Sequence, residues 1–189
     1  MQTQNKSYLY VACALCIALN IVLGIFVGSL KLPFYGDTIG TILSAIMFGP
    51  GYGALVGFLS SFLKSVLSSG LQNVPFALVN VMIGLVAGNI FKNRIVTMKA
   101  AILTGLLLSI LCALVGTPIG IAVYGGLTGT VSDVLVAFLR ESGSSIFAAS
   151  FIAKIGNNLI DKVGSCIIVC LMLKKIPKRY LSLKSCQSH

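Results

Sequence analysis

Long apolar runs constrain this chain more than any other feature of its sequence. The stretches 8–27 and 100–123, each 20 residues or longer, contain no charged side chain. A helix of about 20 apolar residues is what crosses the hydrocarbon core of a bilayer. Only 10% of all residues are charged, against about 25% in a soluble domain. The sequence therefore predicts an integral membrane protein.

The apolar runs predict an all-α, polytopic membrane protein with six transmembrane helices in a single domain over residues 1–189. Near 116–118, a Gly-Thr-Pro sequence suggests a kink or a helix end. Residues 131–141 have apolar side chains at helical spacing, which predicts a short amphipathic helix at the membrane interface. The expected spans are approximately 8–27, 38–49, 52–68, 75–91, 100–123 and 150–173.

The positive charges are concentrated in three segments. The chain has 14 Lys and Arg against 4 Asp and Glu, a net charge of +10. Nine of the positive residues are Lys6, those of the 92–99 loop and those after residue 173, with no acid among them. Basic segments of this kind face the cytoplasm. We therefore expect both termini and the 92–99 loop on the cytoplasmic side, and no nucleic acid as a partner.

Familiar catalytic constellations lack their residues here. The only histidine is His189, so neither a Ser-His-Asp triad nor a histidine-based metal site is expected. No G-x-x-x-x-G-K-[ST] phosphate loop occurs, so energy for uphill transport would come from a partner or an ion gradient. We expect a protein that is not an enzyme and holds no cofactor or metal. Two alternatives stay open: a membrane sensor or assembly subunit without transport, and a small membrane enzyme.

Polar residues of the outer half are candidates for a substrate pocket. In the last span, Lys154, Asn157, Asn158 and Asp161 share one helical face. Polar groups inside a span are costly and usually face a cavity or one another. A self-paired network of Lys154 and Lys162 with Asp161 is therefore the alternative. The expected substrate-binding residues are Asp37, Lys64, Asn80, Tyr124, Asn157, Asn158 and Asp161.

The remaining candidates also have structural alternatives. Asp37 is placed to cap a helix, and Lys64 to snorkel toward the interface. Asn80 is equally suited to bonding a neighbouring helix, and Tyr124 to an interfacial position. If these residues form a pocket, the carboxylates of Asp37 and Asp161 and the amides of the three asparagines suit a neutral or weakly cationic heteroaromatic ligand with hydroxyl groups.

Several motifs occur together along the chain. They are Ala14-Leu-Cys-Ile-Ala18, Leu32-Pro-Phe-Tyr-Gly-Asp-Thr-Ile-Gly-Thr41, Phe48-Gly-Pro-Gly-Tyr-Gly-Ala-Leu-Val-Gly57, Pro75-Phe-Ala-Leu-Val-Asn80 with Gly84 and Gly88, Tyr124-Gly-Gly, and Ile160-Asp-Lys162. In this order they resemble the S components of energy-coupling factor (ECF) transporters, and in particular the branch labelled riboflavin-type. S components are the substrate-binding membrane subunits of bacterial vitamin importers.

The resemblance implies a multi-pass protein of the bacterial cell membrane that captures a small water-soluble vitamin or precursor from outside. Spans one to three, with Ala14 and Ala18 as docking residues, would contact a transmembrane coupling subunit driven by two cytoplasmic ATPases. The S component would turn over in the bilayer to release its substrate. The absence of Trp disfavours thiamine, while riboflavin, pyridoxine, a hydroxymethylpyrimidine and a corrinoid stay open.

Overall fold

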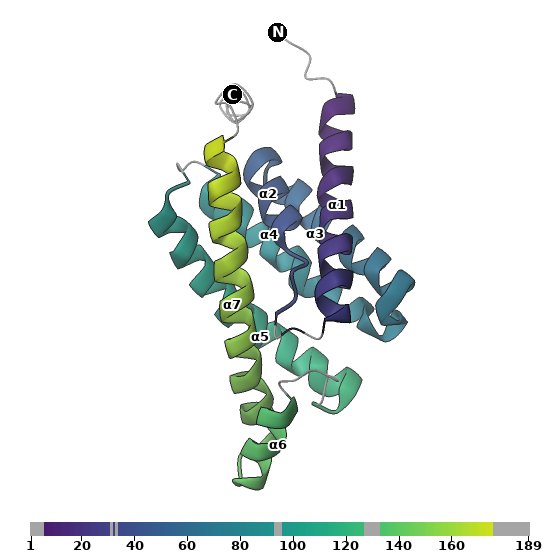
Figure 1. Cartoon of the computed structure of the whole chain (residues 1–189), viewed down its shortest axis with the longest axis vertical. Helices are drawn as coiled ribbons and strands as arrows, with labels where there is room; N and C mark the ends of the chain where they lie inside the picture. Colours follow the sequence, from purple (N-terminus) through teal and green to yellow (C-terminus); the bar gives the residue numbers. More distant parts are fainter. Residues whose placement is uncertain (1–5, 31, 33, 93–95, 127–132, 176–189) are drawn as a thin grey trace.

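The computed structural model describes residues 6–30, 32, 34–92, 96–126 and 133–175, and over these residues it contains helices and no strand (Figure 1). The two short elements are a π turn, η1, and a 3-10 helix, η2. The elements are α1 Lys6–Ser29, α2 Ile39–Phe48, α3 Pro50–Lys64, η1 Ser65–Ser69, η2 Leu71–Phe76, α4 Ala77–Phe91, α5 Met98–Tyr124, α6 Asp133–Glu141 and α7 Ile146–Lys175.

Four helical segments of the described chain are long and apolar enough to cross a membrane: 7–29, 71–91, 98–124 and 146–175. They correspond to the first, fourth, fifth and sixth expected spans. The second expected span, 38–49, forms a helix shorter than predicted. At 1.5 Å per residue, the 10 residues of α2 extend about 15 Å, half of the 30 Å hydrocarbon core. The 15 residues of α3 extend about 22 Å and continue directly into η1, so helical backbone covers the whole third expected span, 52–68.

The break between α2 and α3 has a local cause. Gly49 adopts a φ of 106°, a conformation that favours glycine, and Pro50 occupies the first turn of α3. Proline lacks the N–H that would continue the preceding helix, but it is well placed to begin a new one. The chain therefore leaves α2 at Phe48 and starts α3 almost at once.

The short helix α2 lies inside the molecule. Eight of its ten residues are buried, among them Ile42 and Ala45 with no exposed surface. Asn20 of α1 ties it to its neighbours. The Asn20 amide donates to the hydroxyls of Thr41 (2.9 Å) and Ser60 (3.2 Å) and accepts from the Gly40 N–H (2.7 Å). Such hydrogen bonds between helices satisfy polar groups that lipid cannot.

Glycines allow α3 and α4 to approach closely. A Cβ atom added to Gly84 would lie 2.3 Å from the carbonyl carbon of Gly53, and one added to Gly57 would lie 2.5 Å from the Asn80 carbonyl oxygen. Without side chains at these positions the two backbones come into contact, as small residues permit in membrane proteins. This contact places Asn80 directly beside α3.

Two local expectations can be compared with the described helices. α5 continues through residues 116–118, so a helix end there is wrong: Pro118 lies inside the helix. The helix expected over 131–141 begins at Asp133 among the described residues. Its buried residue is Val136, which packs with Leu139 against α7, whereas Val134 (74% exposed) and Phe138 (64%) face outward. Residues 131–132 lie outside the described part of the chain.

The first turn of α1 and the last turn of α7 lie at the same end of the molecule, with the start of α5 toward that end (Figure 1). Described basic residues gather there: Lys92 and Lys99 flank the α4–α5 connection, and Lys174 and Lys175 end α7. The final turns of α1 and α5 and the start of α7 lie toward the opposite end.

Candidate ligand-binding site

A cavity of about 530 Å³ lies at this opposite end. Its walls come from the second half of α1, the loop before α2, the end of α3, the η2–α4 segment, α5 and α7. This volume is within the range of about 300–1,000 Å³ typical of small-molecule sites. The polar side chains in its wall are Tyr35, Asp37, Ser61, Lys64, Ser65, Gln72, Asn73, Asn80, Tyr124, Lys154, Asn157, Asn158 and Lys162.

Six of the seven residues predicted to bind substrate line this cavity. They come from five separate parts of the chain, and the fold brings them together: Asp37, Lys64, Asn80, Tyr124, Asn157 and Asn158. Asp161 is not part of the wall and lies behind it. The role of all seven in substrate binding stays a prediction.

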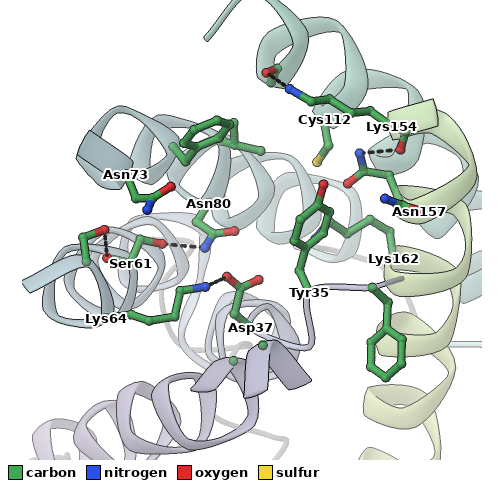
Figure 2. A pocket seen from close by; sticks show the side chains of 18 of the residues that line it. Tyr35, Asp37, Ser61, Lys64, Asn73, Asn80, Cys112, Lys154, Asn157 and Lys162 are labelled. Atoms are coloured by element: carbon green, nitrogen blue, oxygen red, sulfur yellow. Dashed lines mark hydrogen bonds and ion pairs between the residues drawn. The ribbon is translucent and has the colours of Figure 1, made fainter. Parts of the chain in front are cut away.

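Asp37 forms an ion pair with Lys64 across the cavity wall (Figure 2). The two side chains are 14% and 19% exposed, respectively. Asp37 does not cap α2, because Thr38 is the N-cap residue and no side chain there bonds to the helix. Burial raises the pKa of the Asp37 carboxyl, but Lys64 and Lys162 outweigh burial, so this pKa lies below its usual value of 3.8. The carboxylate is therefore charged and already paired.

Asn80 faces both a neighbouring helix and the cavity. Its amide nitrogen donates to the Ser61 hydroxyl at 2.5 Å, and its carbonyl oxygen points toward the centre of the cavity (Figure 2). The residue is 6% exposed. The interhelical bond fixes the orientation of the amide and leaves one hydrogen-bonding group for a ligand.

Asp161 holds the loop before α2 against α7. Its carboxylate accepts from the backbone N–H groups of Tyr35 (3.2 Å) and Gly36 (2.7 Å) and forms an ion pair with Lys162. Gly36 adopts a φ of +65°, and a Cβ there would lie 2.8 Å from Val27. A residue with a side chain would therefore be strained in this turn.

This loop presents an aromatic ring to the cavity. The Lys162 ammonium lies 5.6 Å from the centroid of the Tyr35 ring, within range of a cation–π interaction. Burial raises the pKa of the Tyr35 hydroxyl to about 12, so the phenol is neutral at physiological pH. Asp161 thus positions Tyr35, one of the lining residues, without lining the cavity itself.

Two more aromatic rings stand together elsewhere in the wall. Phe76 and Tyr124 have ring centroids 6.4 Å apart. The Tyr124 hydroxyl donates to the Asn73 side chain at 2.7 Å, which links the end of α5 to η2. With Tyr35, these rings give the cavity flat apolar surfaces between its amides and charges.

Lys154 occupies a notch in α5. Its ammonium donates to the Gly116 carbonyl at 2.5 Å and lies 5.5 Å from the centroid of the Phe76 ring. A Cβ on Gly120 would lie 2.1 Å from the ammonium nitrogen, so only glycine at 120 leaves the notch open. The Asn158 amide donates to the backbone carbonyl of Lys154 at 2.9 Å.

The lining residues that the predicted site omitted include Tyr35, Phe76, Lys154 and Lys162. Both lysines belong to the cluster of polar residues in the last predicted span, and that cluster marks them as candidate pocket residues. Tyr35 lies in a loop motif that suggests an aromatic group at the outer mouth. Phe76 belongs to the Pro75–Asn80 motif, but nothing in that motif marks its ring as part of a pocket.

Ala14 and Ala18 lie away from the cavity. Both are exposed on α1, beside the exposed side chains of Val11, Leu15 and Val22. Within the described residues, no group of three or more His, Cys, Asp or Glu side chains is arranged to hold a metal ion.

Comparison with protein families gives one match. Residues 4–178 match the family model described as "ECF-type riboflavin transporter, S component". The matched range includes every cavity residue named above. No curated protein and no solved structure matches the chain.

Proposed function

Because the chain belongs to the family of ECF-type riboflavin transporter S components, we propose that its cavity of about 530 Å³ binds a small heteroaromatic vitamin or vitamin precursor. The protein is the substrate-binding subunit of an ECF transporter for a vitamin. The family match carries this conclusion, and the cavity supplies a site of suitable size and chemistry.

The wall of the cavity supports a heteroaromatic ligand. Tyr35, Phe76 and Tyr124 offer ring faces on which a planar ligand can stack. The amides of Asn80 and Asn158 both donate and accept hydrogen bonds, as ring nitrogens and carbonyls of a heterocycle require. Riboflavin, pyridoxine, a hydroxymethylpyrimidine and a corrinoid are the ligands to test.

We also propose the membrane arrangement. The chain crosses the bacterial plasma membrane six times with both termini in the cytoplasm, and α2 and α3 contribute the two short crossings. The burial of α2 supports this, since irregular backbone at membrane depth is tolerated where protein surrounds it. The basic residues at one end of the molecule and the cavity at the other support a site open to the outside.

Ligand capture is testable on the purified protein. Mass and absorbance of the ligand carried through purification name its class, and calorimetry with riboflavin and pyridoxine measures affinity. Asn80→Ala is expected to weaken binding at least about tenfold, because a buried hydrogen bond to the ligand is lost. Asn89→Ala, an exposed amide on the same helix, is the matched control. Equal affinities for both variants would contradict the proposed site.

The proposed partners are a transmembrane coupling subunit and two ATPases. We expect Ala14→Trp with Ala18→Trp to abolish uptake by the whole transporter and to spare ligand binding by the isolated subunit, because α1 docks through this exposed face. Ala122→Trp, at an exposed alanine of α5, is the control. Loss of ligand binding instead of uptake would contradict a docking role, and absence of ATPases from the purified complex would favour a sensor.

A further inference from the structure

One ionisable side chain at the cavity has no ion pair. Asp37 is paired with Lys64, and Asp161 with Lys162. Lys154 has no ion-pair partner within the described residues, although it is only 8% exposed. Of these five groups, Lys154 is therefore the one whose charge no ion pair neutralises.

A buried ammonium without a counter-ion is energetically costly. The contacts of Lys154 are a neutral carbonyl on Gly116 and the face of the Phe76 ring. The charge of Asp133, at the start of α6, also acts on Lys154, but the ion pairs of the described residues do not include these two side chains. Neither contact neutralises the ammonium, so the fold keeps a charged group at the cavity at a cost in stability.

The fold also maintains the position of this charge. Gly120 leaves the space that the ammonium occupies, and Asn158 bonds to the backbone carbonyl of Lys154. Lys154, Gly116 and Asn158 all line the same cavity. A group on the ligand that reached this wall would meet a fixed positive charge in surroundings of low polarity, where charge-assisted hydrogen bonds are strong.

We propose that the ligand of this cavity carries a negative group of the carboxylate class, and that Lys154 binds this group. This rests on the proposed function of the cavity as the vitamin site. The carboxylate would supply the ion-pair partner that Lys154 lacks among the described residues. It replaces the expectation of a neutral or weakly cationic ligand, which treated Asp37 and Asp161 as available carboxylates, whereas each already has a lysine partner.

Matched acid and neutral probes test this proposal on the full-length purified chain. Nicotinate with nicotinamide, and 4-pyridoxate with pyridoxine, differ mainly in the negative charge. Calorimetry at pH 7.5 is expected to give the acid of at least one pair an affinity about tenfold or more above its neutral partner. Lys154→Met keeps the alkyl stem and is expected to abolish the preference, while Lys99→Met, at an exposed lysine, leaves it unchanged.

The outcomes separate this inference from the proposed function. Tight binding of a neutral compound, riboflavin included, with unchanged affinity in Lys154→Met would overturn the anion proposal alone. An acid preference that survives in Lys154→Met would also overturn it. If neither the four probes nor riboflavin bind, the proposed function fails and this inference with it. Should Lys154→Met not fold, Gly120→Ala displaces the ammonium while retaining the lysine, and the same loss of preference is expected.

Discussion

The buried pair of Asp161 and Lys162 allows a quantitative test of how the cavity is built. The two side chains are 1% and 3% exposed. Asp161→Asn keeps an oxygen that can accept from the backbone N–H groups of Tyr35 and Gly36, but it removes the negative charge. Lys162 then remains buried without its direct partner.

The expected cost follows from this burial. Removing one member of a buried ion pair destabilises a protein by about 3–5 kcal/mol. Asp37 also acts on Lys162 and reduces the penalty, so we expect about 3 kcal/mol. At about 2–4 °C per kcal/mol for a chain of this length, Tm falls by roughly 6–12 °C. Asp161→Asn combined with Lys162→Met removes both charges of this pair, and most of the loss is expected to be regained.

Thermal unfolding of the purified protein measures this directly. Five described cysteines are free and buried, so a thiol-reactive dye reports their exposure on unfolding. Ligand affinity of Asp161→Asn is expected to change little at temperatures where it is folded, because Asp161 lies behind the wall. Strictly additive Tm changes in the double variant would refute the ion-pair reasoning. A large loss of affinity with an unchanged Tm would instead make Asp161 a direct ligand contact.

Two further predictions concern packing and pH. Gly84→Ala places a methyl group 2.3 Å from the backbone of Gly53 and is expected to lower the free energy of unfolding by about 1–3 kcal/mol. Gly164→Ala is the control, because a methyl group there meets nothing within 4 Å. Equal Tm values for the two variants would contradict the contact between Gly84 and Gly53. Because the pKa of Asp37 is lowered in the folded protein, its pairing with Lys64 stabilises the fold above pH 3.8 and is lost only as the pH falls further. Tm measured from pH 7 to pH 3 is expected to lose this part of its acid dependence in Asp37→Asn, and an identical profile would argue against the pair.

The apolar runs predicted the long helices well and the length of the short helix α2 poorly. α1, α5 and α7 contain the expected spans 8–27, 100–123 and 150–173. Hydrophobicity marks where a chain prefers lipid or protein interior to water, but it does not mark where a helix ends. The second run therefore suggested a span, whereas the backbone turn at Gly49 and the buried position of α2 limit that helix to 10 residues.

The sequence by itself determined that this is a helical membrane protein, because preference for the hydrocarbon core accumulates along contiguous residues and needs no knowledge of distant contacts. The motifs of the chain likewise pointed to its family. Only the tertiary structure decided which polar groups are available to a ligand. Asp37 meets Lys64 across 27 positions, and Asp161 meets the Gly36 backbone across 125. Charge neutralisation depends on such distances in space, so only the fold shows that Asp37 and Asp161 each have a lysine partner, whereas the cavity residue Lys154 has no ion-pair partner among the described residues.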